Sequence, residues 1–266
     1  MQCFKKENHY LKITGWFSVV DKEIVLGIIP ARGGSRRVKK KNIKFLGGKP
    51  LIGWTIEEAK KASSLTHVLV STDDKEIATI SKAFGAQVPF MRPEDISEDV
   101  DTGLVLYHAV QWWEKYRREQ ADFIVCLQPT SPFRRAYDID RCVEIAKATG
   151  ADTVVSVCQV RQHPYWCFEM NTSQRLTSYM NTPLHGDNLV WQKLPLLLYP
   201  NGAVYVTKYA TVMRGRIYGD KIYGYLMPKN RSIDLEEELD FFVASAMFET
   251  YGTEKTEWLQ QSWKVS

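Results

Sequence analysis

The chain has 266 residues, of which 44% are hydrophobic and 25% are charged, and its formal net charge is +4. These ordinary values argue against a disordered chain, and no apolar run approaches the roughly 20 residues that a membrane-spanning helix needs. The length suits one large α/β domain with an insertion, or two small domains.

The cysteine pattern bears on the redox setting. The five cysteines include no Cys-x-x-Cys pair, and Cys126 and Cys158 lie in apolar runs. Free cysteines in such runs usually pack as small hydrophobic residues. This usage indicates a reduced, cytoplasmic location and gives no sign of a zinc site.

The two ends of the chain stand outside the predicted domain. Residues 1–22 contain a short apolar patch but lack a small-residue cleavage site, so we predict an N-terminal extension and not a signal peptide. The domain itself is predicted to span residues 23–252, and residues 253–266 are predicted to form a C-terminal tail.

The first predicted strand, residues 24–29, opens into a cationic loop. The strand is almost wholly apolar, which is typical of burial on both faces. In the loop, every ionisable side chain between Arg32 and Lys44 is basic, and these seven belong to a total of 35 Lys and Arg. Gly33 and Gly34 are expected to adopt backbone angles that other residues resist. We call residues 32–44 the basic loop and predict that it binds a polyphosphate.

This loop matches neither of the two commonest phosphate motifs. G-x-G-x-x-G is absent, and Gly47-Gly48-Lys49-Pro50 has Pro where a Walker loop has Ser or Thr. Charge alone also allows a solvated loop that contacts nucleic acid. The modest net charge and the glycine pair after a buried strand favour a local anion site instead.

Helices and strands alternate after the basic loop. Helices are predicted at residues 50–60, 74–84, 102–118 and 137–148, and strands at residues 67–71, 86–90, 122–127 and 153–158. This alternation predicts an α/β fold with a doubly wound, mostly parallel sheet. Ligands of such sheets bind at the carboxyl ends of the strands. The basic loop, Thr72-Asp73, Arg92 and the loop at Gln128 are therefore expected to converge on one crevice.

The alternation fails between about residues 160 and 200. The segment carries few charges and five prominent aromatic residues: Tyr165, Trp166, Phe168, Tyr179 and Trp191. Because exposed aromatic side chains are favoured at interfaces, we predict an inserted arm through which the chain dimerises. The alternative is an arm that folds back onto its own domain. His163 and His185, also in this segment, are predicted to be packing or surface residues.

The last elements are strands at residues 203–207 and 222–227 and a closing helix at residues 235–249. Asp234 is the predicted N-cap of that helix, and Glu236, Glu237 and Glu238 suit the positive end of its dipole. These ordinary roles explain the acidic residues without a metal. The Trp112-Trp113 pair, at helical spacing with other apolar residues, is predicted to pack into the core.

Six stretches, in order between about residues 24 and 250, together resemble one family. The basic loop resembles the pattern P-A-R-x-G-S-K-G-x-x-x-K-N of the acylneuraminate (sialic-acid-type) cytidylyltransferases. The other five stretches are V-S-T-D at 70–73, F-M-R-P-E at 90–94, L-Q-P-T-S-P-F-R at 127–134, Y-P-N-G-A-V-Y at 199–205 and S-I-D-L-E at 232–236. Arg36 replaces the family Lys, Arg37 replaces a common Gly, and Glu236 replaces the usual Asp.

The resemblance implies a Rossmann-like nucleotidyltransferase fold and a set of site residues. Gln128 and Asn201 would bind an acidic sugar, and Asp234 and Glu236 would hold Mg²⁺, although the longer Glu236 leaves its direct ligation open. Arg32, Lys41 and Asp234 would be catalytic, with Asp234 the candidate base. The implied nucleotide-binding residues are Arg32, Gly34, Ser35, Arg36, Lys41, Asn42, Arg92 and Thr102.

The implied activity transfers CMP from CTP to a nine-carbon α-keto acid sugar, N-acetylneuraminate or legionaminate-like, and releases pyrophosphate. Such an activity serves the synthesis of cell-surface glycans. The resembling enzymes are dimers, and the arm would let Arg161 or Arg175 meet the sugar carboxylate across the interface. No nucleic-acid or membrane partner is expected.

Three alternatives remain open. Arg37 suggests a pseudaminic acid cytidylyltransferase, whereas the stretch from Asn201 to Tyr205 favours the sialic or legionaminic branches. A sugar-1-phosphate guanylyltransferase is a rival within the enzyme class. A nucleic-acid-binding protein is a rival from another class, and Asp234 and Glu236 argue against it.

Overall fold

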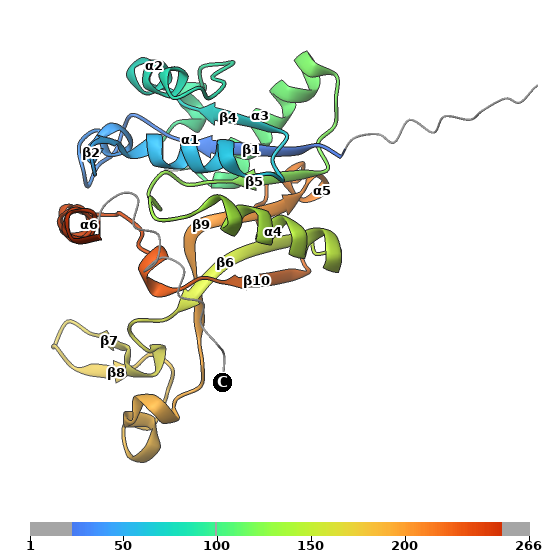
Figure 1. Cartoon of the computed structure of the whole chain (residues 1–266). Coiled ribbons are helices and arrows are strands. Elements are labelled where there is room, and N and C mark those ends of the chain that lie inside the picture. Colours follow the sequence, from blue (N-terminus) through green and yellow to red (C-terminus); the bar gives the residue numbers. More distant parts are fainter. Residues whose placement is uncertain (1–22, 99, 252–266) are drawn as a thin grey trace, which may run out of the picture.

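A six-stranded sheet runs through the centre of the molecule (Figure 1) in the computed structural model, which describes residues 23–98 and 100–251. The predicted N-terminal extension and C-terminal tail lie outside the described residues. The strand order is β10-β6-β9-β5-β1-β4. The strands are β1 (Val25–Pro30), β4 (His67–Ser71), β5 (Phe123–Cys126), β6 (Thr153–Gln159), β9 (Leu198–Lys208) and β10 (Ile222–Leu226).

The sheet is mostly parallel, as predicted. β1 pairs in parallel with both β4 and β5, and β10 pairs in parallel with β6. β9 is the exception, because it runs antiparallel between β5 and β6. Its inner part covers the predicted strand at residues 203–207, but β9 begins at Leu198 and so reaches back towards the arm.

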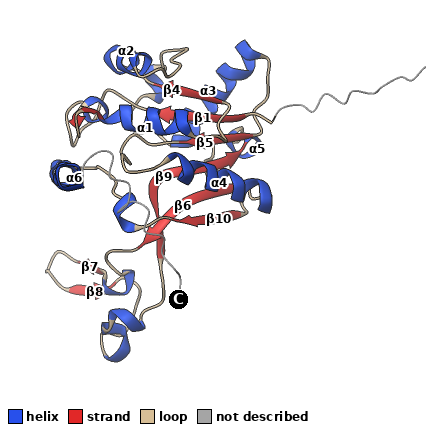
Figure 2. Cartoon of the chain, in the orientation of Figure 1, coloured by secondary structure: helices blue, strands red, loops and turns tan. Residues whose placement is uncertain are grey.

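Helices cover both faces of the sheet, which makes it doubly wound (Figure 2). One face packs against α1 (Leu51–Lys61) and α4 (Ala136–Thr149), and the other packs against α3 (Thr102–Arg117) and the short α5 (Tyr209–Val212). Trp113 is buried in the second layer, as predicted, whereas Trp112 is only half-buried. The buried Cys126 thiol lies in the same layer, and burial raises its pKa to about 12.

The next elements border the first layer, and Ile77 packs into its core. A small hairpin of β2 (Phe45–Leu46) and β3 (Lys49–Pro50) leads into α1. α2 (Lys75–Ala83) begins where predicted, because the Asp74 side chain accepts hydrogen bonds from the N–H groups of Glu76 and Ile77. None of the helices in the described ranges is both long enough and apolar enough to cross a membrane.

Residues 86–90 do not form the predicted strand. Two isolated bridges, Leu69 to Gln87 and Thr72 to Met91, stand in its place. Pro89 lies between them and has no N–H group to donate, so the ladder cannot continue along this edge of β4. The second bridge still places Arg92 beside the end of β4.

The closing helix α6 (Glu238–Tyr251) begins later than predicted, and Asp234 is therefore not its N-cap. The Asp240 carboxylate accepts hydrogen bonds from the N–H groups of Glu236 and Glu237, both at 2.8 Å. The Leu235 N–H donates to the Thr130 carbonyl at 2.9 Å, and the Leu235 side chain is buried. These bonds hold residues 232–237, here called the acidic segment, out of the helix.

The arm, residues 160–197, leaves the sheet between β6 and β9 (Figure 1). It contains a hairpin of β7 (Phe168–Met170) and β8 (Leu176–Ser178), followed by short 3-10 turns. His163 is buried at the centre of a small aromatic cluster with Tyr165, Trp166 and Trp191. Of the five aromatic residues predicted to lie at an interface, Phe168 and Tyr179 are the strongly exposed ones.

Candidate active site

A cavity of about 580 Å³ opens at the carboxyl ends of β1 and β5. This is the edge at which parallel sheets bind ligands. The residues around it come from the basic loop, the loop after the Thr72 bridge, the start of α3, the Gln128 loop and the acidic segment. Nine of the predicted site residues line it: Arg32, Ser35, Arg36, Lys41, Asn42, Arg92, Thr102, Gln128 and Glu236.

The basic loop forms the cationic wall, and its backbone is fixed from two sides. The Asn42 side chain donates to the Arg32 carbonyl at 2.9 Å, and the Gly33 N–H donates to Asp73 at 3.0 Å. A Cβ at Gly33 would lie 2.6 Å from an Asp74 carboxylate oxygen, so this glycine permits a close approach. The positive φ in the loop belongs to Lys40, not to Gly33 or Gly34. Gly34 is exposed and does not line the cavity.

Arg92 supplies a buried cation to the same wall. Its side chain is only 4% exposed and forms an ion pair with Asp73 at 3.5 Å. Within the described chain its Nε atom has no hydrogen-bond partner. Burial lowers the pKa of Arg92, the neighbouring Arg32 lowers it further, and Asp73 opposes both. A buried guanidinium with an unused donor is suited to an anionic ligand.

The Gln128 loop is held by a buried arginine beneath it. Arg134 donates to the carbonyl of Gln128 at 3.1 Å, to the carbonyl of Ala203 at 2.6 Å and to the hydroxyl of Thr55 at 2.6 Å. Burial lowers the pKa of Arg134 to about 10. The Gln128 side chain points towards Gly202, where an added Cβ would lie 2.9 Å from its Oε1. Gly202 therefore leaves room for this side chain.

Asp234 lies behind the cavity lining, next to Gln128 and Thr130. The Cβ position of Gly202 is 3.4 Å from the Asp234 carboxyl carbon, so Asp234 and Gln128 flank the same glycine. Burial raises the pKa of Asp234, and Glu236 and Asp240 act in the same direction. A hydrogen bond from Thr130 and the charge of Lys41 oppose this rise. Its Oδ1 is buried without a hydrogen-bond partner in the described part of the chain.

Lys41 connects the basic loop to the acidic segment. Its ammonium group donates to the Leu235 carbonyl at 3.0 Å and lies 3.5 Å from the Glu236 carboxylate. Arg37 donates to the same carboxylate at 2.7 Å. Two residues that depart from the family pattern, Arg37 and Glu236, thus contact each other. The Lys41 side chain is 13% exposed, so it is not a solvated loop charge.

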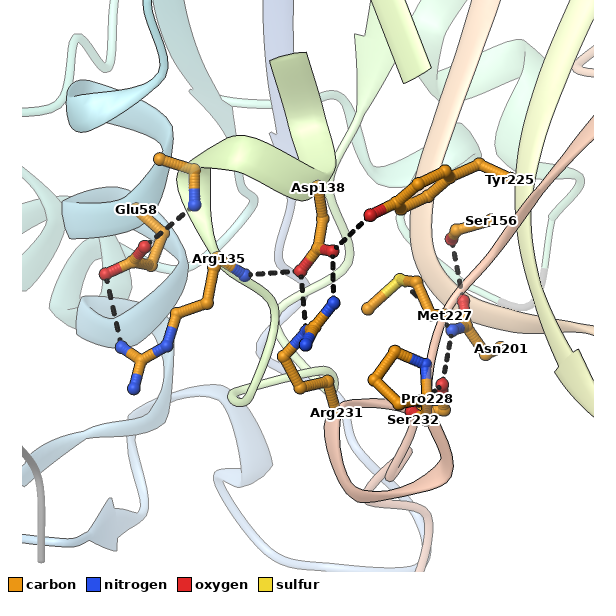
Figure 3. A network of polar contacts seen from close by, with 11 residues as sticks. Glu58, Arg135, Asp138, Ser156, Asn201, Tyr225, Met227, Pro228, Arg231 and Ser232 are labelled. Carbon is orange, nitrogen blue, oxygen red and sulfur yellow. Dashed lines mark hydrogen bonds and ion pairs between the residues drawn. The ribbon is translucent and has the colours of Figure 1, made fainter. Parts of the chain in front are cut away.

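Asn201 is the predicted site residue that the structure places farthest from that role. It is buried, and its side-chain amide donates to Ser232 at 2.8 Å and accepts from Ser156 at 2.6 Å (Figure 3). It does not line the cavity. These contacts support the acidic segment from behind, and they leave no side-chain atom of Asn201 directed at a substrate.

The two carboxylates of Asp234 and Glu236 suit a magnesium ion that shares its ligands with substrate and water. They are too few for a metal ion that is held by protein side chains alone. The described residues contain no group of three or more His, Cys, Asp or Glu that could hold a metal. Mg²⁺ is commonly bound by one or two carboxylates together with substrate phosphates and water. The buried, unpartnered Oδ1 of Asp234 is a hard oxygen donor of this kind.

Sequence reasoning overlooked two residues that build this site. Thr130 contacts Asp234 through its side chain and Leu235 through its carbonyl. Arg134 holds the Gln128 loop from below. Both belong to the stretch Q-P-T-S-P-F-R, which we noted for its resemblance to the family and otherwise interpreted as a turn-rich loop. Arg134 lies in the loop between β5 and α4, so no local pattern in the sequence marks it as buried.

The fold is shared with solved nucleotidyltransferases. A solved CMP:2-keto-3-deoxy-manno-octonic acid synthetase in complex with CTP superposes with a TM-score of 0.62 at 16% identity, covering 86% of this chain and 99% of that one. A 4-diphosphocytidyl-2C-methyl-D-erythritol synthase from Anaerococcus prevotii gives 0.58 at 11% identity, covering 85% and 96%. At these identities the likeness concerns the fold alone.

The cytidylyltransferase family model matches residues 26–182. CMP-N,N'-diacetyllegionaminic acid synthase of Legionella pneumophila is 32% identical over 85% of this chain and 96% of its own length. N-acylneuraminate cytidylyltransferase A of Danio rerio is 32% identical over 88% of this chain, which spans 53% of that protein. The chain therefore belongs to the cytidylyltransferase family, in the acylneuraminate group that its motifs predicted.

Proposed function

We propose that this enzyme transfers CMP from CTP to a nine-carbon α-keto acid sugar of the neuraminate or legionaminate type. The observation that carries the proposal is the cavity with a cationic wall on one side and the Asp234 carboxylate behind the other. The names of the Legionella and zebrafish relatives support the substrate class. The family assignment counts against the guanylyltransferase and nucleic-acid-binding alternatives.

Different residues of the cavity would serve different parts of the reaction. Arg32, Arg36, Lys41 and Arg92 would bind the triphosphate and stabilise the departing pyrophosphate. Ser35, Asn42 and Thr102 would contact the rest of the nucleotide, and Gln128 would orient the sugar. The sugar hydroxyl would attack the α-phosphorus in line, so no covalent enzyme intermediate is required.

Asp234 would take two roles at the reacting centre. With Glu236 it would hold Mg²⁺, which supplies charge neutralisation on the phosphate oxygens. Its raised pKa also suits a group that accepts the proton of the sugar hydroxyl, because a general base works best with a pKa shifted towards the working pH.

A panel of purified nonulosonic acids with CTP or GTP, assayed for pyrophosphate release, tests this function. We expect release with CTP and a neuraminate or legionaminate, abolished by EDTA and restored by Mg²⁺. Preference for GTP would overturn the nucleotide assignment, and full activity in EDTA would overturn the metal assignment. Pseudaminic acid belongs in the panel because a relative from Campylobacter coli, 27% identical, is named a post-translational flagellin modification protein.

We further propose that the enzyme is a homodimer joined by the arm. Met170 and Leu176 are paired across the β7–β8 hairpin and are 67% and 54% exposed. The arm also exposes Leu184, Leu189 and Leu196, although it has only the His163 cluster as a core of its own. Such a surface is typical of an interface, and a partner would cover it. Arg161 and Arg175 are exposed on the arm and are available to a partner's sugar site.

Light scattering tests the assembly. A mass matching one 30.7 kDa chain at working concentration would refute the dimer. If a dimer is found, the double variant Met170→Lys/Leu176→Glu should be monomeric, whereas Tyr116→Lys, at a similarly exposed residue on α3, should remain dimeric. A dimeric Met170/Leu176 variant would place the interface elsewhere. The four cysteines in the described residues are free and three of them are buried, which supports the prediction of a reduced, cytoplasmic location.

A further inference from the structure

A buried ion pair between Arg231 and Asp138 connects the turn before the acidic segment to α4. Arg231 ends the 3-10 turn Lys229–Arg231, just before the acidic segment. Its guanidinium grips both carboxylate oxygens of Asp138, with Nη2 at 2.9 Å from Oδ1 and Nε at 3.2 Å from Oδ2 (Figure 3). The two side chains are 4% and 0% exposed. The pair therefore lies in the protein interior and has the bidentate geometry that fixes orientation.

Further donors saturate the Asp138 carboxylate. The Tyr225 hydroxyl from β10 donates to Oδ1 at 3.0 Å, and the Arg135 N–H donates to Oδ2 at 2.9 Å. The Arg231 guanidinium also lies over the Tyr137 ring, 4.8 Å from its centroid. Asp138 thus joins α4, β10 and the 3-10 turn at one point (Figure 3).

The contacts that follow fix the backbone on both sides of Asp234. Before it, Ser232 donates to the Pro228 carbonyl at 2.8 Å and accepts from Asn201 at 2.8 Å. After it, the N–H of Leu235 is bonded to Thr130 and its carbonyl to Lys41. Asp234 lies between these anchors with a buried oxygen that nothing in the described chain satisfies. The backbone position of Asp234 is therefore fixed by the contacts of its neighbours.

Stability alone is a weak reason for such a pair. Removing two charges from water is costly, and replacing a buried ion pair with well-packed apolar residues is often neutral or stabilising. The bidentate contact between Arg231 and Asp138, in contrast, fixes where the residues after Arg231 lie. Such fixing matters in an active site, because reacting groups must be held within a fraction of an ångström. We propose that Asp138, acting through Arg231, is a positioning residue for Asp234. This inference rests on the proposed role of Asp234.

Asp138→Asn with Asp140→Asn as its matched control tests the proposal. Asp140 lies two residues further along α4 and also accepts four hydrogen bonds, from the N–H and hydroxyl groups of Ser63 and Ser64. Its hydrogen bonds in the described part of the chain all go to Ser63 and Ser64 and none to the acidic segment, so its loss should affect stability alone. For Asp138→Asn we expect kcat to fall on the order of 10- to 100-fold with the KM for CTP nearly unchanged. Asp140→Asn should keep its kcat.

Amide hydrogen exchange gives a readout that does not depend on turnover. Peptides covering residues 232–237 should exchange faster in Asp138→Asn than in the wild type, and at the wild-type rate in Asp140→Asn. Unchanged exchange in Asp138→Asn, or equal acceleration in both variants, would overturn the proposal. If the wild type does not turn over CTP, the proposed function fails, whereas the exchange result still decides whether Asp138 fixes this segment.

A double variant separates positioning from folding. Asp138→Leu/Arg231→Met removes both charges and leaves no unpaired ion, so it should melt above Asp138→Asn, although the Tyr225 hydroxyl and the Arg135 N–H lose their acceptor. We expect its kcat to stay as low as that of Asp138→Asn, because the bidentate contact between residues 138 and 231 is still missing. Recovery of wild-type kcat together with stability would show that the pair is only a structural element, and would overturn the proposal.

Discussion

The basic loop and the acidic segment meet at the same cavity, but their side chains are held differently. Arg36 and Arg37 in the loop are 73% and 69% exposed, and their ion partners are exposed as well. In the acidic segment, Ile233 and Leu235 are buried on either side of Asp234, and Ser232 is bonded to Asn201. The loop can therefore adjust to a flexible triphosphate, whereas the segment presents a carboxylate in a prepared position. Substitutions on the two sides should have different kinetic and thermodynamic signatures.

Asp234→Asn should have the largest effect on turnover. It removes the proposed base and metal ligand while keeping the shape of the side chain. We expect kcat to fall by about 10² to 10⁴-fold. Mg²⁺ should raise the melting temperature of the wild type in the presence of CTP but not that of the variant. Near-normal turnover in Asp234→Asn would remove Asp234 from the reaction.

The same substitution should stabilise the fold at neutral pH. Burial raises the pKa of Asp234 above its ordinary value of 3.8. The protonated form is thus favoured in the folded protein, and its contribution to stability is complete below pH 3.8 and lost as the pH rises through the folded pKa. Asparagine carries no charge and avoids this loss. The variant should melt above the wild type at pH 7, and the difference should disappear near pH 3.

Lys41→Ala should come next, because Lys41 belongs to both sides of the comparison. Its loss removes a phosphate-binding cation and leaves the Leu235 carbonyl without its donor, which costs about 1–3 kcal/mol of stability. We therefore expect a higher KM for CTP together with a lower melting temperature. Lys39→Ala, an exposed residue of the same loop that does not line the cavity, is the control. An unchanged melting temperature in Lys41→Ala would show that the contact with Leu235 contributes nothing.

Arg32→Ala should weaken nucleotide binding without lowering the stability of the fold. A hydrogen bond to a charged group contributes about 1.5–3 kcal/mol, which corresponds to a roughly 10- to 150-fold weaker binding of CTP. Arg32 also lowers the pKa of the buried Arg92, so its removal relieves a repulsion in the folded protein. Calorimetry of CTP binding and a melting curve check both statements. Wild-type affinity would mean that the loop is only a solvated basic surface.

Arg37→Gly should have the smallest effect. The pair that Arg37 forms with Glu236 is exposed at both ends, and such pairs contribute about 0–1 kcal/mol. We expect a change of less than about fivefold in the KM for CTP, and salt screening should reduce it further. Measurements at low and high KCl test this. A large, salt-independent loss would show that Arg37 binds substrate directly.

Much of the fold followed from local patterns in the sequence. The apolar run before the basic loop, the Asp74 cap and the turn at Gly85 all act within a few residues, so a local pattern can predict them. The direction of β9 could not be predicted in this way. A strand buried on both faces has the same apolar pattern whether its neighbours are parallel or antiparallel to it.

The candidate site also has one part that local sequence predicts and one part that it does not. The basic loop identifies itself by seven cations in one short stretch, and five of its predicted residues line the cavity. The surroundings of Asp234 depend on contacts between distant residues, such as Arg231 with Asp138, 93 positions apart. Asp234 therefore looked like a helix cap, and Asn201 looked like a sugar ligand. The burial of Asp234 and Asn201 separates their actual roles from the predicted ones. Burial depends on residues far away in the sequence, so the neighbouring residues alone do not predict it.

The pairing of β6 with β9 has a consequence for how this scaffold can vary. Gln159 at the end of β6 is directly opposite Leu198 at the start of β9. The whole arm is therefore one long connection between two adjacent, antiparallel strands, and its ends are already held together by the sheet. Insertions of this kind cost little extra loop entropy. We therefore expect that the arm can be exchanged between relatives without disturbing the sheet or the cavity at its carboxyl edge.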